Sequence, residues 1–257
     1  MKKLIEGASK LGIEFNARQV KQFELYYQEL IEWNKKINLT AITDYSSVQV
    51  KHFLDSLTIT LALPEEEVTR PDFNIVDIGT GAGFPGVPLK ILFPQPRLVL
   101  IEPTTKKTAF LHHIIRKLEL ENVEVLNTRA EEAAHLPLYR EQFALVLSRA
   151  VALLPTLAEL TLPFCQIGGR FIAQKKGKID QEVNRAKEAI AALGGKLGQI
   201  RKIELDEFND ARYLVIIDKI YPTPSKYPRR PGLPRRRPIQ EANGEVEKEI
   251  EETKKSL

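Results

Sequence analysis

The sequence of 257 residues has few of the side chains that bind metals or form disulfides. Its single cysteine, Cys165, excludes a disulfide within the chain and a cysteine-based zinc cluster. Four histidines leave little room for other metal chemistry, and we expect no metal site. The chemistry of the protein is therefore expected to depend on a bound organic cofactor rather than on thiols or metals.

Long hydrophobic runs are also missing. No apolar stretch approaches the roughly 20 residues that cross a bilayer, and Glu6 and Lys10 interrupt the first residues too early for a signal peptide. With 43% hydrophobic and 28% charged residues, the composition is that of an ordinary folded chain. We expect a cytoplasmic monomer without membrane contact. The formal charge of +4 is a weak indication of an anionic partner.

The hydrophobic pattern divides the chain into three parts. Residues 1–70 predict a small helical cap, in which Asn16 caps an amphipathic helix over 16–37 and a second helical stretch follows through Leu57. Residues 71–221 alternate short apolar strands with helices, which is typical of an α/β doubly wound, Rossmann-like sheet. Strands are predicted at 74–78, 98–101, 123–126, 143–147 and 170–173, and helices at 88–93, 106–118, 151–164 and 181–193. Two further strands, 200–205 and 213–220, are expected to close the sheet as an antiparallel hairpin.

The third part, residues 222–257, has an unusual composition. Residues 222–238 alternate six prolines with six cations and contain no acidic residue, so we expect neither a regular helix nor a central strand there. Residues 241–257 carry six glutamates and three lysines, and we expect this acidic end to be mobile.

The clearest chemical signal is the glycine-rich segment between the first predicted strand and the next helix. Gly79, Gly81 and Gly83 permit a tight turn and let a ligand approach the backbone. Glu102 ends the second predicted strand, where a carboxylate can accept hydrogen bonds from both ribose hydroxyls of a nucleoside. Asp77 lies two residues before the first glycine, where it can hold the ammonium group of a methionine moiety through water. The segment also satisfies the dinucleotide pattern, so an NAD(P)-linked oxidoreductase is an alternative.

The wider set of motifs resembles the bacterial 16S ribosomal RNA guanine-7 methyltransferase G family, also called glucose-inhibited division protein B. The resemblance covers roughly residues 14–238. It is carried by the glycine segment from Asp77 to Gly86 and by further matching positions: Asn38-Leu39-Thr40, His52 with Asp55-Ser56, Glu102 with Lys106-Lys107, Arg129 to Glu132, Ser148-Arg149-Ala150, Lys176-Gly177 and Tyr227 to Gly232. Pro103 departs from the family, in which small residues are more usual after the carboxylate.

This resemblance implies methyl transfer from S-adenosyl-L-methionine to ring nitrogen 7 of a guanosine in the 530 loop of 16S ribosomal RNA. The implied cofactor contacts are Gly79, Phe84, Glu102, the Ala130-Glu131 pair and Arg149. In such a family the cap faces the cofactor and the substrate, which makes His52 and Asp55 candidate catalytic residues. Phe84 and Asp55 are further candidates for stabilising the cationic guanine that methylation creates.

Basic residues at the same edge of the sheet predict contacts with RNA phosphates. Lys175, Lys176 and Lys178 follow the fifth predicted strand, beside Arg149 at the end of the fourth. Asn38 in the cap motif is a further candidate for RNA contact, and the tail supplies Arg229, Arg230, Arg235, Arg236 and Arg237. The expected partner is the 16S ribosomal RNA or the small ribosomal subunit. A non-catalytic RNA-binding assembly factor that retains the fold is a second alternative.

Overall fold

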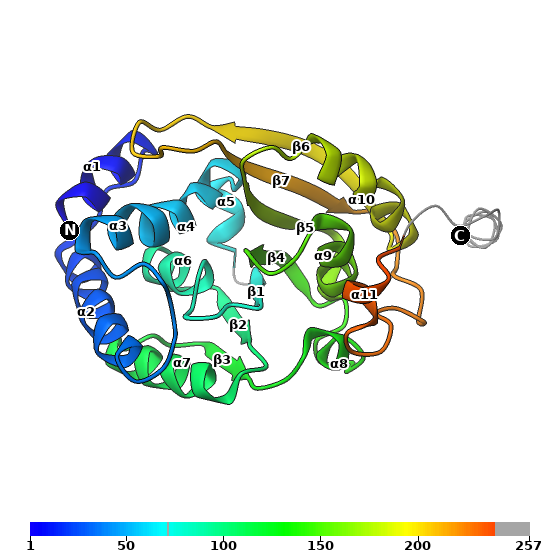
Figure 1. The fold of residues 1–257 in the computed structure, drawn as a ribbon, viewed down its shortest axis with the longest axis horizontal. Helices are drawn as coiled ribbons and strands as arrows, with labels where there is room; N and C mark the ends of the chain where they lie inside the picture. Colours follow the sequence, from blue (N-terminus) through cyan, green and yellow to red (C-terminus); the bar gives the residue numbers. More distant parts are fainter. Residues whose placement is uncertain (71, 240–257) are drawn as a thin grey trace.

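The fold is built on one seven-stranded sheet with strand order β3-β2-β1-β4-β5-β7-β6 (Figure 1). The computed structural model describes residues 1–70 and 72–239. The strands are β1 (Asn74–Ile78), β2 (Arg97–Ile101), β3 (Val123–Leu126), β4 (Phe143–Arg149), β5 (Cys165–Lys176), β6 (Gly195–Ile203) and β7 (Arg212–Lys219). The acidic end at 241–257, which we expect to be mobile, lies outside the described residues.

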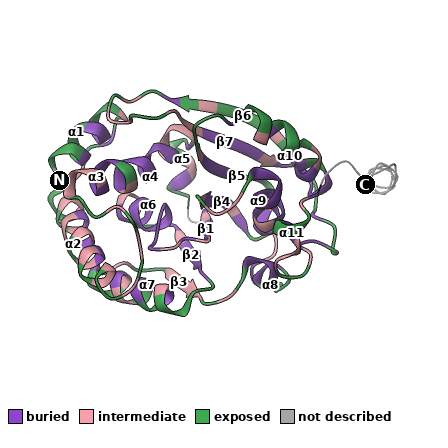
Figure 2. Ribbon diagram, in the orientation of Figure 1, coloured by how far each residue is buried: buried purple, intermediate pink, exposed green. Residues whose placement is uncertain are grey.

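The strand directions confirm the predicted sheet. Strands β1 to β5 pair in parallel, and β7 lies antiparallel between β5 and β6. Most residues of β1, β2 and β4 are buried, as expected where helices cover both faces of a parallel sheet (Figure 2). β5 begins five residues before the predicted start at Arg170. The strand order reverses between β1 and β4, and ligands of open α/β sheets bind at such a point.

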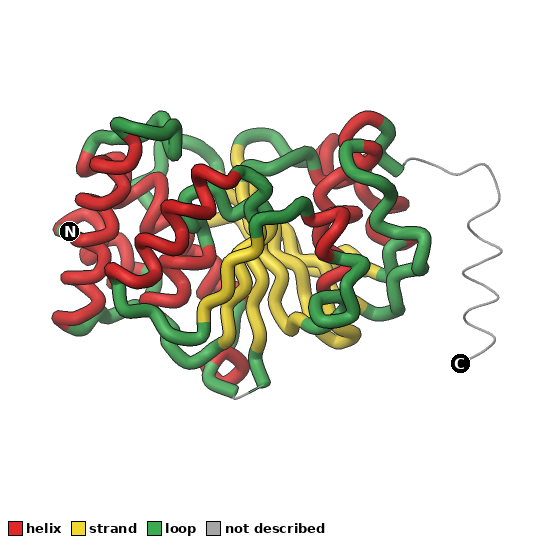
Figure 3. The backbone as a smooth tube through the Cα atoms, turned by 90° about the horizontal axis from the view of Figure 1, so that it is seen from below, coloured by secondary structure: helices red, strands yellow, loops and turns green. Residues whose placement is uncertain are grey.

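Helices cover both faces of the sheet, which gives three layers (Figure 3). One face packs against the N-terminal helices together with α6 (Gly86–Leu92) and α7 (Thr105–Lys117). The other face packs against α8 (Ala130–Ala133), α9 (Leu154–Thr161), a 3-10 turn (Leu162–Phe164) and α10 (Asp180–Ala192). Within the described residues, no helix is both long enough and apolar enough to cross a membrane.

The N-terminal part is helical, as the sequence predicts. It contains α1 (Lys2–Lys10), which was not predicted from the sequence, and α2 (Ala17–Asn34). Asn16 and Gln19 form a reciprocal capping box at the N-terminus of α2. After α2 come α3 (Tyr45–Val48), a π-helical turn (Gln49–Leu54), α4 (Asp55–Leu57), a 3-10 turn (Thr58–Ala62) and α5 (Glu65–Val68). Phe23 and Phe53 join the apolar cluster that covers one face of the sheet, so this part shares a core with the sheet. The domain boundary at residue 70 stays a prediction.

The basic tail is folded onto the body of the protein, and one expectation for it is wrong. Prolines do not exclude a helix there, because Leu233–Arg236 form the short helix α11, with Pro234 in its first turn. Proline is tolerated at that position because its missing N–H has no partner to lose. Tyr227 and Ile239 are buried in the apolar cluster beneath α9 and α10.

Candidate functional site

The glycine segment forms the turn between β1 and α6, and two of its glycines have different surroundings. Gly81 has a φ of +62°, and a Cβ built on it would meet nothing within 4 Å. Gly83 has a φ of +98°, and its Cβ would lie 2.6 Å from the Tyr26 hydroxyl. Gly81 is therefore the position at which the loop leaves space for a ligand beside bare backbone, whereas Gly83 is required by packing against α2.

Asp77 lies beneath this loop and is fully buried. Its Oδ2 accepts hydrogen bonds from the Thr80 hydroxyl at 2.6 Å and from the Gly86 N–H at 2.9 Å. Its Oδ1 is buried without a hydrogen-bond partner. Burial raises the pKa of Asp77 to about 6. An unpaired carboxylate oxygen costs free energy unless a ligand or water satisfies it, and a cationic group such as the ammonium of S-adenosyl-L-methionine suits it.

Glu102 ends β2 next to the same loop and is 4% exposed. Its Oε2 accepts the Gly81 N–H at 3.1 Å, and its Oε1 accepts the Thr104 N–H at 2.9 Å. Each carboxylate oxygen has two lone pairs, so these bonds leave acceptor sites for ribose hydroxyls. The carboxylate thus ties the loop to the next strand, in the position from which the sequence predicts ribose binding.

Ala130 and Glu131 begin α8, which follows β3. Glu131 is 8% exposed, and its Oε1 accepts the backbone N–H of Gly232 at 2.9 Å. The structure therefore brings the basic tail to a residue that the family resemblance implies as a cofactor contact. Sequence reasoning missed this contact, because 101 residues separate the two partners.

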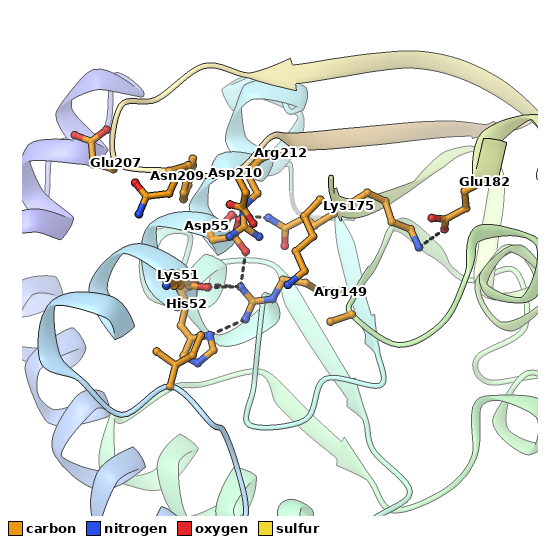
Figure 4. A pocket seen from close by; sticks show the side chains of 15 residues that line it. Lys51, His52, Asp55, Arg149, Lys175, Glu182, Glu207, Asn209, Asp210 and Arg212 are labelled. Atoms are coloured by element: carbon orange, nitrogen blue, oxygen red, sulfur yellow. Dashed lines mark hydrogen bonds and ion pairs between the residues drawn. The ribbon is translucent and has the colours of Figure 1, made fainter. Parts of the chain in front are cut away.

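Arg149, at the end of β4, joins the sheet to the cap. Its guanidinium lies 2.8 Å from Oδ2 of Asp55 and 3.5 Å from Nδ1 of His52 (Figure 4). It also donates to the carbonyl oxygens of Lys51 and His52, and it lies 5.1 Å from the centre of the Phe84 ring. The predicted residues His52, Asp55, Phe84 and Arg149 therefore form one cluster.

Within this cluster, His52 is held as a neutral ring. Its Nε2 lies 2.7 Å from the Thr40 hydroxyl, and burial together with the nearby Arg149 charge lowers its pKa to about 3. Its ring stacks on Phe84 at 4.7 Å, and Tyr26 stacks on Phe84 at 5.3 Å. Phe84 is 6% exposed, and its ring packs between the cap and the loop. That the Phe84 ring stabilises a cationic guanine stays a prediction.

A cavity of about 640 Å³ opens beside this cluster (Figure 4). Its lining includes the predicted residues His52, Asp55, Arg149, Lys175 and Lys176. The lining residues that sequence reasoning missed include Lys51, Gln174 and Arg212. The topology contains a signal for Arg212, because β7 runs antiparallel to β5 and its first residue pairs with Lys176 at the functional end of the sheet. Arg212 lies 3.7 Å from Oδ1 of Asp55.

The remaining residues predicted to contact RNA are either held in ion pairs or exposed to solvent. Lys175 is paired with Glu182 at 2.5 Å and donates to the Ala152 carbonyl, whereas Lys176 and Lys178 are exposed. Asn38 is exposed in the loop after α2. Among the tail arginines, Arg229 is paired with the buried Glu159 at 2.6 Å, and the other four are exposed: Arg230, Arg235, Arg236 and Arg237.

Comparison with known proteins identifies the family. The family model described as rRNA small subunit methyltransferase G matches residues 19–209. The chain belongs to this family. A ribosomal RNA small subunit methyltransferase G from Dehalococcoides mccartyi is 52% identical over 93% of this chain and 100% of its own length. One from Pelotomaculum thermopropionicum is 50% identical over 91% of this chain and 96% of its own.

A solved methyltransferase shares the fold at low sequence identity. The geranyl diphosphate C-methyltransferase of Streptomyces coelicolor superimposes with a TM-score of 0.50 and 14% identity, covering 76% of this chain and 98% of the other. This similarity confirms the Rossmann-like architecture. Membership of the methyltransferase family confirms S-adenosyl-L-methionine as the cofactor over the dinucleotide alternative. Unpaired Asp77 Oδ1 and the open backbone at Gly81 fit that cofactor.

Proposed function

We propose that this protein transfers a methyl group from S-adenosyl-L-methionine to ring nitrogen 7 of a guanosine in the 530 loop of 16S ribosomal RNA. The observation that carries the proposal is the cavity lined by Asp55, Arg149 and other charged side chains next to the glycine loop, in a member of the rRNA small subunit methyltransferase G family. Arg149 belongs to both places, because it lines the cavity and lies against Phe84 of the loop. The cavity is of the size that holds a small ligand or a nucleobase.

The reaction requires little acid–base chemistry from the protein. When bound, the cofactor supplies a methyl group on a sulfonium, so the guanine nitrogen forms the new C–N bond while the electron pair of the broken C–S bond stays on sulfur. That nitrogen carries a lone pair and no proton, so no general base is needed. The neutral His52 ring is consistent with this, since a pKa of about 3 makes it a poor base at neutral pH.

The side chains of the cavity act through position and charge. Aligning two reactants can lower the activation free energy by roughly 7–11 kcal/mol in favourable cases. Asp55 lines the cavity, and its carboxylate opposes the positive charge that guanine gains on methylation. Arg149 and Arg212 orient that carboxylate at 2.8 and 3.7 Å. We therefore propose Asp55 as the catalytic residue and His52 as the group that supports Arg149.

The RNA is proposed to approach over exposed polar and cationic side chains, of which Lys176 lines the cavity. Lys176, Lys178, Asn38 and the exposed tail arginines provide donors for phosphate oxygens. Proteins read unpaired RNA bases far more readily than bases in a duplex, which favours a loop guanosine as the target. The proposed partner is the small ribosomal subunit or its RNA, and we propose that a single copy of the chain acts on it.

The direct test is transfer of a labelled methyl group. Small ribosomal subunits that lack the modification are incubated with the protein and labelled S-adenosyl-L-methionine, and the product is mapped by mass spectrometry of RNA fragments. We expect one 7-methylguanosine in the 530 loop, and a greatly reduced yield with Asp55→Ala. Methylation of another base or position would contradict the proposal. Cofactor binding without transfer to any subunit preparation would favour the non-catalytic assembly factor.

A further inference from the structure

The segment 228–234 of the basic tail contacts Glu131, one of the implied cofactor contacts. The backbone N–H of Gly232 donates to Oε1 of Glu131 at 2.9 Å. Within residues 1–70 and 72–239, the structure records no other hydrogen bond to this carboxylate. Oε2 therefore keeps its lone pairs for another donor, while Oε1 is fixed in position by the tail.

A buried ion pair anchors the segment. Glu159 on α9 has a fully buried side chain, and it accepts four hydrogen bonds from Arg229. The backbone N–H of Arg229 lies 2.8 Å from Oε1 of Glu159, and the guanidinium reaches Oε2 at 2.6 Å. Two-pronged arginine–carboxylate contacts fix orientation as well as distance. The direction in which the chain leaves Arg229 toward Gly232 is thereby set.

Further contacts hold the segment from both sides. Nε2 of His135, just after α8, lies 2.8 Å from the Pro228 carbonyl, and the Thr156 hydroxyl donates to the Pro234 carbonyl at 3.2 Å. Arg140 donates to the Tyr227 carbonyl at 2.9 Å. The docked segment therefore bridges α8, which carries Glu131, and α9, which carries Glu159.

We infer that this docked segment positions Glu131 to accept a hydrogen bond from the exocyclic amino group of the cofactor's adenine, with Arg229 as its anchor and the Gly232 N–H as its contact. Arg229 and Gly232 are positioning residues that act through Glu131. The inference rests on the proposed function, since it requires S-adenosyl-L-methionine to bind with its adenine at α8. It gives one arginine of the tail a role in cofactor binding, separate from RNA contact.

The test compares two neighbouring arginines in the full chain. Arg229→Met removes the anchor, and Arg230→Met removes the same charge from an exposed position. The dissociation constant of S-adenosylhomocysteine is measured by calorimetry, together with that of its purine analogue, which lacks the exocyclic amino group. Circular dichroism and thermal melting report folding. Where Arg229→Met does not fold, Arg229→Lys carries the same test, because it keeps the charge beside Glu159 and loses the two-pronged contact.

We expect Arg229→Met to bind S-adenosylhomocysteine about tenfold more weakly, which corresponds to one hydrogen bond to a charged group. Arg230→Met should stay within about twofold of the parent protein. The purine analogue should bind the parent and Arg229→Met with similar affinity, because it has no amino group to lose. That pattern, which a general structural defect does not produce, supports the inference.

Two results overturn the inference and leave the proposed function intact. One is equal affinity of the parent and Arg229→Met for S-adenosylhomocysteine. The other is an equal loss of affinity for S-adenosylhomocysteine and for the purine analogue, which would mean that the tail supports the cleft without orienting Glu131. Absence of S-adenosylhomocysteine binding by the parent protein would instead refute the proposed function, and the inference with it.

Discussion

At the scale of single residues, Asp77 combines a structural and a binding role. One carboxylate oxygen closes the glycine loop through Thr80 and Gly86, and the other is buried without a partner. Burial raises its pKa to about 6, above the usual value of 3.8. The native state therefore holds the proton of Asp77 more tightly than the unfolded state does. Asp77 consequently lowers the free energy of unfolding as the pH rises from about 4 to about 6.

Asp77→Asn should separate these two roles. Relative to the parent protein, the variant should gain about 2 kcal/mol in free energy of unfolding as the pH rises from about 4 to about 6, because the amide does not ionise. Its affinity for S-adenosylhomocysteine at pH 7.5 should fall about tenfold or more, since the charged acceptor for the ligand's ammonium is lost. Denaturant titrations at several pH values and calorimetry at pH 7.5 measure both effects.

The pH dependence of binding provides the control. Affinity of the parent protein for S-adenosylhomocysteine should decrease as the pH falls below about 6, where Asp77 becomes protonated. The Asp77→Asn variant should show a much flatter profile. Parallel profiles for the two proteins would show that Asp77 does not bind the ammonium group.

At the scale of elements, the turn between β1 and α6 has one side that packs and one side that binds. Gly83 faces Tyr26 and Val87, and a Cβ there would lie 2.6 Å from the Tyr26 hydroxyl. A Cβ on Gly81 would lie in open space. The same glycine-rich pattern therefore serves both the close packing against α2 and the approach of a ligand.

A pair of alanine variants distinguishes the two sides. Gly81→Ala should lower the free energy of unfolding by only about 1–2 kcal/mol, the penalty for a side chain at positive φ. It should weaken S-adenosylhomocysteine binding at least tenfold, because the methyl group occupies the ligand's space. Gly83→Ala should lower the free energy of unfolding by about 3 kcal/mol or more, because it adds a steric clash to that penalty. Thermal melts and calorimetry measure both properties. Equal loss of stability in the two variants would contradict this assignment.

The sequence predicts elements better than it predicts the contacts between them. The short apolar run in 74–78 and the glycines after it locate β1 and the loop, because these signals are local. The convergence of Asp55, Arg149 and Arg212 is different, since it depends on a π-helical turn in the cap and on an antiparallel strand inserted between two others. Such contacts join residues about 90 to 160 positions apart, and no local pattern encodes them.

At the scale of the whole molecule, the net charge of +4 conceals an uneven distribution. The tail holds six cations over residues 222–238, but folding withdraws Arg229 into the ion pair with Glu159. Arg235 and Arg236 remain exposed on α11. The sequence predicts RNA contact for all five tail arginines, whereas in the structure Arg229 anchors the tail and the other four are exposed.

Replacing both exposed arginines of α11 tests the second group. Arg235→Gln with Arg236→Gln should weaken binding to a 530-loop RNA and reduce the salt slope of log affinity by about 0.7 for each lost phosphate contact. The affinity for S-adenosylhomocysteine should stay unchanged, because neither side chain touches Glu159 or Glu131. Filter binding over a series of salt concentrations provides the slope.

The matched control, Lys21→Gln with Arg116→Gln, removes two exposed charges from α2 and α7. If control and tail variants lower the slope equally, the tail contributes only to net charge; a smaller slope in the tail variant alone makes α11 part of the RNA interface.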